Sequence, residues 1–484
     1  MKKKSLGVNA ILNSLQTLLN LIFPLITFPY VSRVLSVDGM GKYNFSNSVI
    51  SYFILLAGLG ISRYAVREGA RLRDDRVEFS KFASRIFSIN LCSTIVSYLL
   101  LFVVIFTFNN LEIYVNAILI FSIQIFFTTL GVDWLYTIYE EYAYITLRNI
   151  LFKITSIILL FLFVKHSNDY LKYAAITTFA SVGSYALNFI HAKKFCDIKI
   201  TWKFNWKPYI IPILTIFGTM LAVTIYVNSD IIILGFLKND YTVGIYSISA
   251  KIYGMVGPMI SATMAVTIPR LAMLMGKKRY KEYKRLFKRL LQSMIIIVIP
   301  SVIGLMLTSR NVILIIAGKN YLQSTSSLRI LSLALFFGTM NTILVECVLI
   351  PSKREKATLI TAIVAAVINV ALNFVLIPIL SENGAAVTTV VAELSSMLIN
   401  FRFSKDIIGK DLFNKEFLKN GLCAIFGGIG IALVCLLIGN TVSSNVTQLI
   451  LSVIFSIAIY SLILWIFRNE LFFDIVNKIK LFIK

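Results

Sequence analysis

Residues 226–253 of this chain read YVNSDIIILGFLKNDYTVGIYSISAKIY. This stretch joins two apolar helices through a short polar turn, residues 238–240, and each helix carries one charge, Asp230 before the turn and Lys251 after it. At about 1.5 Å per helical residue, both charges lie roughly 10–14 Å below one membrane surface. Because a charge in hydrocarbon costs roughly 2.5–3.5 kcal/mol, we expect them to face each other or to line a wet cavity.

The composition places almost the whole chain in a membrane. Of its 484 residues, 58% are hydrophobic and only 14% are charged. Apolar runs follow one another, each near the roughly 20 residues that cross a bilayer. The five cysteines show no metal-ligand spacing, and two histidines cannot build a His-rich metal site. We therefore expect an integral membrane protein without a metal or bound cofactor.

The apolar periodicity predicts an all-α protein with about fourteen transmembrane helices. The run after Lys4 is too long for a signal peptide and has no small-residue cleavage site, so it is predicted to be a retained first span. The predicted spans cover residues 9–35, 43–66, 84–107, 113–136, 149–165, 171–191, 208–237, 242–268, 290–316, 326–350, 358–379, 384–404, 419–439 and 447–467.

Lysine and arginine predict the orientation of these spans. Segments on the side of the N-terminus carry 38 of these residues, and loops on the opposite side carry 8. Because cytoplasmic loops are enriched in Lys and Arg, both termini are predicted to be cytoplasmic. The net charge of +24 then faces anionic lipid headgroups, and no nucleic-acid partner is expected. Residues 276–290 and the C-terminal tail are predicted as basic amphipathic helices at that surface.

A faint internal repeat relates the two halves of the predicted bundle. A shift of 203 residues places Gly41-Lys42-Tyr43 on Gly244-Ile245-Tyr246 and keeps the spans in register. Because this shift covers six spans, the copies share one orientation and are parallel repeats. We therefore predict an N-terminal lobe at 1–207, a C-terminal lobe at 208–410, and two further helices with an interfacial tail at 411–484.

A polar stripe runs along the first predicted span. Asn9, Asn13, Gln16 and Asn20 follow at steps of three and four, which is one helical face. The seventh span repeats this pattern more weakly and ends it at Asp230. A water-filled cleft between the lobes explains such faces, and hydrogen bonding between membrane helices is the alternative explanation.

Other charges inside the predicted spans are candidates for a functional role. Arg33 and Arg63 lie at the ends of the first two spans, while Glu393 lies near the middle of the twelfth, too deep for an easy reach to the surface. Asp133 and Glu346 lie near the inner ends of spans 4 and 10, where placement at a helix end explains a carboxylate equally well.

Three segments resemble a known family: FPYVSRVLSVDGMGKYNFSNSV (28–49), GVDWLYTIYEEYAYITLRN (131–149) and the stretch 226–253. With the fourteen-span layout, they resemble the polysaccharide flippases of the Wzx type, in the multidrug/oligosaccharidyl-lipid/polysaccharide exporter superfamily. The resemblance covers essentially the whole chain. It implies a protein of the bacterial plasma membrane in which two six-helix lobes rock around a central cavity. Such a flippase moves an undecaprenyl-diphosphate-linked oligosaccharide from the inner to the outer leaflet by alternating access.

The resemblance also suggests site residues. By this resemblance, recurrent family positions are matched by Asp133-Trp134, Arg148, Asp230 and Lys251. Thr137-Ile138 departs from the Gln-Gly expected after the Asp-Trp pair. A diphosphate requires cations, since Arg pairs with it bidentately and Lys attracts it as a point charge. The candidate substrate ligands are Lys251, Arg148, Arg33, Arg63, Asn20 and Gln16. The candidates for a gate or for a coupling proton or sodium site are Asp230, Glu393, Glu346 and Asp133.

Two alternative functions stay open at this point. An ion-coupled multidrug antiporter of the same superfamily would favour carboxylates over cations in its cavity. A membrane glycosyltransferase or polysaccharide polymerase would need catalytic groups on sizeable external loops, but the predicted external loops are short and carry unpaired carboxylates. We therefore expect no enzyme. The expected partners are the lipid-linked glycan and membrane lipids, with a functional monomer that associates loosely with glycan-assembly enzymes.

Overall fold

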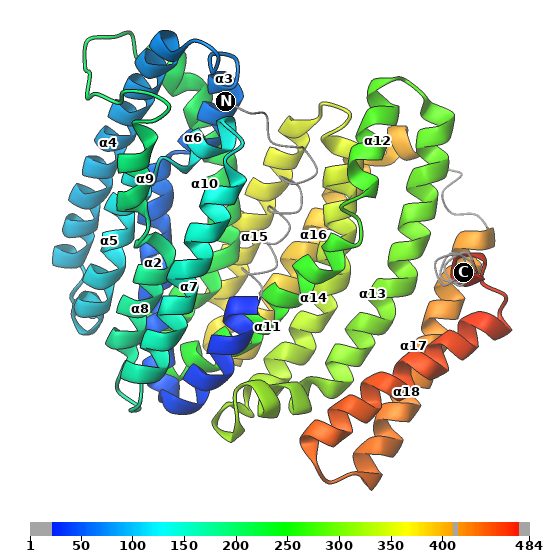
Figure 1. Cartoon of the computed structure of the whole chain (residues 1–484). Coiled ribbons are helices and arrows are strands. Elements are labelled where there is room, and N and C mark those ends of the chain that lie inside the picture. Colours follow the sequence, from blue (N-terminus) through cyan, green and yellow to red (C-terminus); the bar gives the residue numbers. More distant parts are fainter. Residues whose placement is uncertain (1–21, 410–414, 474–484) are drawn as a thin grey trace. The chain divides into compact units, whose positions relative to one another are not determined.

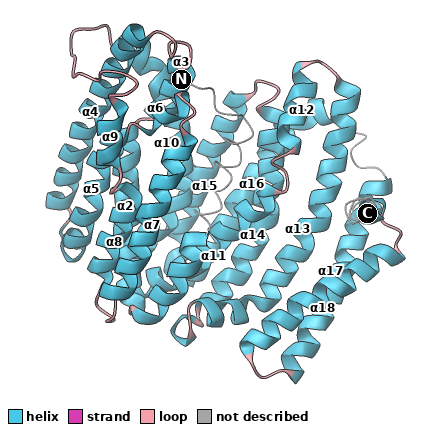
Figure 2. Cartoon of the chain, viewed as in Figure 1, coloured by secondary structure: helices cyan, strands magenta, loops and turns pink. Residues whose placement is uncertain are grey.

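The computed structural model describes residues 22–409 and 415–473, and all its regular elements in these ranges are helices (Figure 2). This confirms the predicted all-α class. The physical reason is that a helix satisfies its backbone hydrogen bonds within one segment, which an apolar run in lipid requires. The chain divides into two compact units, Met1–Gly244 and Ile245–Lys484.

In the first unit, α2 packs against α4, α5, α8 and α10 and forms the centre of the helix bundle (Figure 1). A short apolar helix, Ile22–Val34, precedes it. The remaining elements are α2 (Val37–Gly58), α3 (Ile61–Gly69), α4 (Arg76–Thr107), η1 (Asn109–Tyr114), α5 (Val115–Gly131), α6 (Asp133–Ile138), α7 (Tyr142–Phe163), α8 (Tyr170–Val182), α9 (Tyr185–Ala192) and α10 (Lys207–Leu237).

In the second unit, α16 packs between α14 and α15, whereas α17 and α18 pack on α13 (Figure 1). The helix α11 begins just before the unit boundary and leads into this unit. The elements are α11 (Asp240–Ala262), α12 (Thr267–Gly276), α13 (Tyr280–Ile316), η2 (Lys319–Tyr321), α14 (Ser324–Leu344), the π-helical turn η3 (Val345–Leu349), α15 (Glu355–Leu380), α16 (Glu382–Ile408), α17 (Lys415–Thr441) and α18 (Asn445–Ile466).

The helices follow the predicted spans. Within the described residues, 11 helices are long and apolar enough to cross a membrane, and the pair α11–α12, bent by 56°, makes a twelfth. The predicted span 171–191 is divided between α8 and α9, and the first span falls on Ile22–Val34 from residue 22 onward. Within the described residues the predicted spans therefore fall mainly on helical chain, with breaks inside 43–66 and 113–136 as well. The number fourteen stays a prediction.

Two boundaries in the structure differ from those expected from the sequence: the start of α13 and the boundary between the two compact units. The basic stretch 276–290 is helical from Tyr280 onward and is continuous with the apolar run that follows, because α13 extends to Ile316 and no residue before Pro300 interrupts its backbone ladder. Its position at the membrane surface stays a prediction. The compact units divide at Gly244 rather than at residue 207, since α10 packs on α2 and α3. Compactness does not test which helices move as one body, so the predicted lobes stay a prediction, and most of the C-terminal tail lies outside the described residues.

The irregular chain before α10 is held by a ladder of serines on α4. Alternate residues of an extended chain are about 6.6 Å apart, and residues four apart on a helix are about 6.0 Å apart, so the two spacings match. Each serine accepts one backbone N–H bond, and the ladder holds this extended chain along α4. The donors are Asp197, Lys199 and Thr201, and the acceptors are Ser80, Ser84 and Ser88, at 3.1, 3.0 and 2.8 Å.

The internal repeat is visible as a reciprocal backbone contact in the first unit. A Cβ added to Gly41 in α2 would overlap the backbone of Asp240, and one added to Gly244 would overlap the carbonyl of Val37. The 203-residue shift relates Val37 to Asp240 just as it relates Gly41 to Gly244. Each repeat thus supplies one glycine and the backbone that the other glycine meets. Small residues allow membrane helices this close approach.

We expect Gly41→Ala to lower the thermal unfolding midpoint, because overpacking against a fixed backbone costs about 1–3 kcal/mol. The matched control is Gly218→Ala in α10, where an added Cβ meets open space and alanine favours the helix. Intrinsic-fluorescence melting of both variants in detergent micelles makes the comparison. Equal midpoints would contradict the tight contact at Gly41.

Candidate functional site

A break between α5 and α6 places Asp133 at a cavity of about 380 Å³ in the first unit. Val132, between the two helices, has a φ of 39°, a left-handed conformation that a β-branched residue adopts only under constraint. The cavity is lined by Ser51, Ile54, Leu55, Gly58, Gly60, Ile61, Ser62, Arg63, Asn90, Thr128, Thr129, Asp133, Trp134, Tyr185 and Met220.

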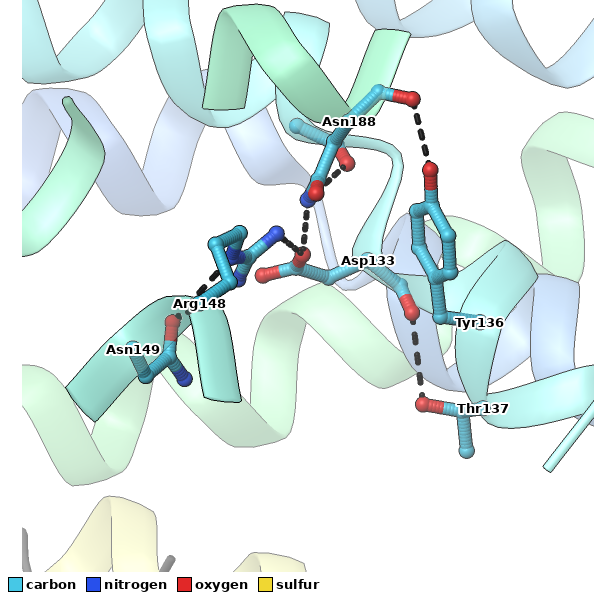
Figure 3. Close-up of polar contacts among 7 residues, drawn as sticks. Asp133, Tyr136, Thr137, Arg148, Asn149 and Asn188 are labelled. Carbon is cyan, nitrogen blue, oxygen red and sulfur yellow. Dashed lines mark hydrogen bonds and ion pairs between the residues drawn. The ribbon is translucent and has the colours of Figure 1, made fainter. Parts of the chain in front are cut away.

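Residues from α7 and α9 fix Asp133, among them Arg148 and Asn188 (Figure 3) and Tyr185, which also hydrogen-bonds to it. Asn188 of α9 donates from Nδ2 to Asp133 Oδ1 at 2.8 Å and to the Gly131 carbonyl at 2.9 Å. Arg148 of α7 brings Nη1 to 3.7 Å from the same carboxylate oxygen. Asn188 therefore ties both sides of the α5–α6 break to α9, and Arg148 neutralises the carboxylate that the break exposes.

Arg148 lies behind Asp133 and does not line the cavity. Its side chain is 5% exposed, whereas that of Asp133 is 43% exposed. The guanidinium lies 5.5 Å from the ring centre of Tyr185 and 6.0 Å from that of Tyr144, and its Nη2 donates to Asn149 Oδ1 at 2.9 Å. Within the described chain, its Nη1 has no hydrogen-bond partner and only the ionic contact with Asp133.

A second helix break, between α2 and α3, places Arg63 at this cavity. Leu59 and Gly60 have φ values of 44° and 73° and separate α2 from α3, and a Cβ at Gly60 would overlap Ile216 of α10. Arg63 follows in the first turn of α3, is exposed and lines the cavity. Among the residues that the structure describes, Arg63 has no hydrogen-bond or ion-pair partner. Because α3 packs on α6, the two breaks present Arg63 and Asp133 to one space.

The second unit contains its own carboxylate-bearing cavity, of about 390 Å³. Glu393 of α16 is 9% exposed and accepts a hydrogen bond from the Tyr253 hydroxyl at 3.2 Å. A Cβ at Gly338 of α14 would lie 3.1 Å from its carboxyl carbon, so glycine leaves room for the acid. The described lining carries no Lys or Arg: Tyr253, Gly254, Gly257, Pro258, Ser261, Leu335, Gly338, Thr339, Thr342 and Glu393.

The other predicted site residues lie outside these two cavities. Asp230 is buried in α10 and interacts electrostatically with Tyr52 of α2. Lys251 is exposed on α11, and Glu346 is half-buried in the π-helical turn η3. The Arg33 guanidinium is exposed and donates to the carbonyl of Pro29 at 3.0 Å.

Two predicted ligands, Gln16 and Asn20, lie outside the described residues. Asn188 and Tyr185 were not predicted as site residues, although an asparagine within an apolar span is a signal that the sequence contains. Tyr253 and Gly338 gave no such signal, because nothing in their local sequence relates them to Glu393.

Helix breaks that present charges to cavities inside a bundle of membrane-spanning helices define this chain as a multi-pass membrane transporter. Residues 6–275, more than half of the chain, match the family described as polysaccharide biosynthesis protein. The chain belongs to this family. The expected relationship to Wzx-type flippases of the exporter superfamily is thereby confirmed, and the protein is a transporter rather than an enzyme.

Individual relatives agree with this assignment. The chain is 23% identical over 368 residues to a "Putative O-antigen transporter" of Shigella dysenteriae, covering 73% of this chain and 89% of that one. It is 25% identical over 319 residues to the capsular polysaccharide biosynthesis protein CapF of Staphylococcus aureus, covering 63% and 76%. The fold resembles lipid II flippase MurJ in an inward closed conformation, with a TM-score of 0.75, 19% identity, and coverage of 96% of this chain and 100% of that chain.

We expect a coupled effect when the Asp133–Arg148 pair is broken. Asp133→Ala leaves the Arg148 charge uncompensated and should cost about 2 kcal/mol, less than the roughly 3–5 kcal/mol of a fully enclosed pair, because the Asp133 side chain is 43% exposed. Adding Arg148→Met should recover part of this loss. Denaturant unfolding in micelles measures the double-mutant cycle, with an expected coupling of roughly 1–2 kcal/mol.

The exposed pair Arg73–Glu140, at 3.1 Å with side chains 38% and 42% exposed, is the control for this cycle. Its coupling should stay below about 1 kcal/mol, because water screens an exposed ion pair. Additive losses at Asp133 and Arg148 would show that their proximity carries no interaction energy.

Proposed function

We propose that this transporter flips an undecaprenyl-diphosphate-linked oligosaccharide, the repeat unit of a polysaccharide, from the cytoplasmic to the outer leaflet of a bacterial plasma membrane. The family and its relatives support a transporter of polysaccharide assembly. The observation that carries the substrate chemistry is Arg63. It is an exposed cation in a cavity whose one acidic lining residue, Asp133, already has Arg148 as its counter-ion.

The first cavity suits both parts of such a substrate. Arg63 is placed to pair with the diphosphate through two parallel N–H bonds, a geometry that arginine favours with phosphate oxygens. Hydroxyl and amide groups from four helical segments offer donors and acceptors to sugar hydroxyls, and the polyprenyl chain stays in lipid. These polar lining groups are Ser51, Ser62, Asn90 and Thr128.

The other predicted ligands take complementary roles in this proposal. Lys251 and Arg33 attract the diphosphate, while Gln16 and Asn20 bind sugar hydroxyls. Arg148 acts as a positioning residue, since it neutralises Asp133 and leaves Arg63 as the net charge of the cavity. The lobes alternate access with both termini in the cytoplasm, as the 38-to-8 distribution of Lys and Arg suggests. The chain works as a monomer because neither cavity needs a residue from a second copy.

Arg63→Ala is expected to abolish flipping while the protein still inserts, because the diphosphate loses its bidentate partner. Arg63→Lys should keep partial function as a point charge. The assay is complementation of a strain that lacks the chromosomal gene, with the lipid-linked glycan on the cytoplasmic side quantified. The matched control is Arg67→Ala, one helical turn further along α3, where the guanidinium pairs with Glu68 outside the cavity. Normal complementation by Arg63→Ala would contradict the proposed substrate site.

We propose that Glu393 binds the coupling proton or sodium ion, with Asp230, Glu346 and Asp133 as further gate or coupling candidates. Glu393 is buried, lines the cavity of the second unit and accepts from the Tyr253 hydroxyl. This same observation favours the alternative function, an ion-coupled multidrug antiporter whose cationic substrate is bound by the carboxylate. The two functions differ in which cavity binds the cargo and in whether Glu393 binds an ion or a drug.

Glu393→Gln should make transport insensitive to an imposed proton or sodium gradient, because the neutral amide can neither protonate nor hold a cation. The measurement is flipping of lipid-linked glycan in proteoliposomes, with and without each gradient. Glu382→Gln is the control, since Glu382 is another buried acid of α16 that accepts from Gln323 at 2.7 Å. If wild type exports cationic dyes in exchange for ions and moves no glycan, the antiporter function replaces the flippase proposal.

A further inference from the structure

A polar pocket of about 270 Å³ lies in the second unit, apart from the Glu393 cavity. It is formed by the N-terminal part of α13, the N-terminal part of α17 and the chain that follows α18. Its lining contains four cations and two carboxylates, so its net charge is positive. The cations are Arg285, Lys288, Arg289 and Lys419, and the carboxylates are Glu416 and Glu470.

The floor of this pocket is built from buried amides. Asn469 is 1% exposed and donates from Nδ2 to Oδ1 of Asn420, itself 8% exposed, at 2.7 Å. Gln292 is 7% exposed, and its Nε2 donor has no hydrogen-bond partner among the described residues. An unsatisfied buried N–H group costs about 1–3 kcal/mol. A ligand that offers an acceptor oxygen at this point would remove that cost.

The cations of the rim are only partly neutralised. Lys288 donates to Glu416 at 2.8 Å and is therefore paired. Arg285 and Lys419 are exposed and make no hydrogen bond or ion pair within the ranges the structure describes. Arg285, Lys419 and the Gln292 amide offer donors to one pocket, whose lining also contains the carboxylates Glu416 and Glu470. This set of donors matches the oxygens of a phosphate group, which accept charge-assisted bonds from several donors at once.

The position of the pocket favours a phosphate that is attached to a lipid. Its residues lie at the ends of the predicted spans 290–316, 419–439 and 447–467, which is the depth of the headgroups. Exposed apolar side chains follow closely on the same elements, with Leu418 64% and Leu422 45% exposed. Basic pockets between membrane helices on the cytoplasmic side bind anionic headgroups in this way.

We propose that this pocket binds the phosphate of an anionic phospholipid from the cytoplasmic leaflet. The headgroup phosphate accepts from Arg285, Lys419 and Gln292, and its acyl chains lie along the exposed face of α17. The bound lipid thereby links α13 to α17 and to the end of α18. The inference does not depend on the transported substrate, because no residue of this pocket belongs to either cavity described above.

The test is native mass spectrometry of the full-length protein, titrated with phosphatidylglycerol, phosphatidylcholine or inorganic phosphate. Wild type should retain phosphatidylglycerol in preference to phosphatidylcholine. Arg285→Ala/Lys419→Ala should weaken phosphatidylglycerol binding by about tenfold or more, since a hydrogen bond to a charged group contributes on that scale. The charge-matched control is Lys277→Ala/Lys281→Ala, which removes two exposed lysines outside the pocket and should bind as wild type does.

The variant Gln292→Leu distinguishes a role of Gln292 in lipid binding from a role in the stability of the fold. The lipid proposal predicts several-fold weaker retention of phosphatidylglycerol, whereas a merely structural glutamine would change the melting temperature alone. Equal losses in the Arg285/Lys419 and Lys277/Lys281 double variants would reduce the interaction to general surface charge and overturn the site. Wild-type protein that binds inorganic phosphate but shows no preference for phosphatidylglycerol would assign the pocket to a free anion and overturn the lipid ligand.

Discussion

Hydrocarbon offers no hydrogen bond to a backbone group that leaves its helix, and this constraint governs where the charges of this protein lie. A break in a membrane helix is tolerated only where protein or a wet cavity satisfies the freed groups. At the α5–α6 break, Asn188 takes up the carbonyl of Gly131 and the carboxylate of Asp133 together. The carbonyl that the break frees is therefore hydrogen-bonded, and the carboxylate of Asp133 is presented to the cavity at the same position.

The charge balance of the first cavity follows from this arrangement. Asp133 would repel a diphosphate if it acted alone, but Arg148 lies behind it and compensates its charge. Arg148 is buried, and the contacts of its guanidinium with the rings of Tyr144 and Tyr185 hold it beside Asp133. Arg63, placed by the second helix break, then acts as the net charge toward the cavity. The cavity of the second unit is lined by the buried carboxylate of Glu393, which accepts from the Tyr253 hydroxyl. We propose a coupling role for this acid and a cargo-binding role for the first cavity.

Several expectations from the sequence hold because they depend on local chemistry. Apolar runs of bilayer length become helices whatever their neighbours, so the predicted spans agree with the helices. The repeat was readable as Gly41 and Gly244 because a backbone contact tolerates only glycine. The helix predicted at 276–290 is continuous with the following span in the structure, since nothing in the sequence breaks the helix between them.

The helices, the family resemblance and the identity of the embedded charges can be predicted from the amino-acid sequence, because hydropathy and side-chain chemistry are properties of single segments. Which charges meet follows from the packing of the helices. Arg148 and Arg63 were equal candidates as phosphate ligands, and burial separated them: one is enclosed behind Asp133, and the other is open to the cavity. Gly338 leaves room for the Glu393 carboxyl group and Tyr253 donates a hydrogen bond to it, although both residues are distant from Glu393 in the chain. Burial and pairing depend on packing between helices, and no local pattern encodes which faces will pack together.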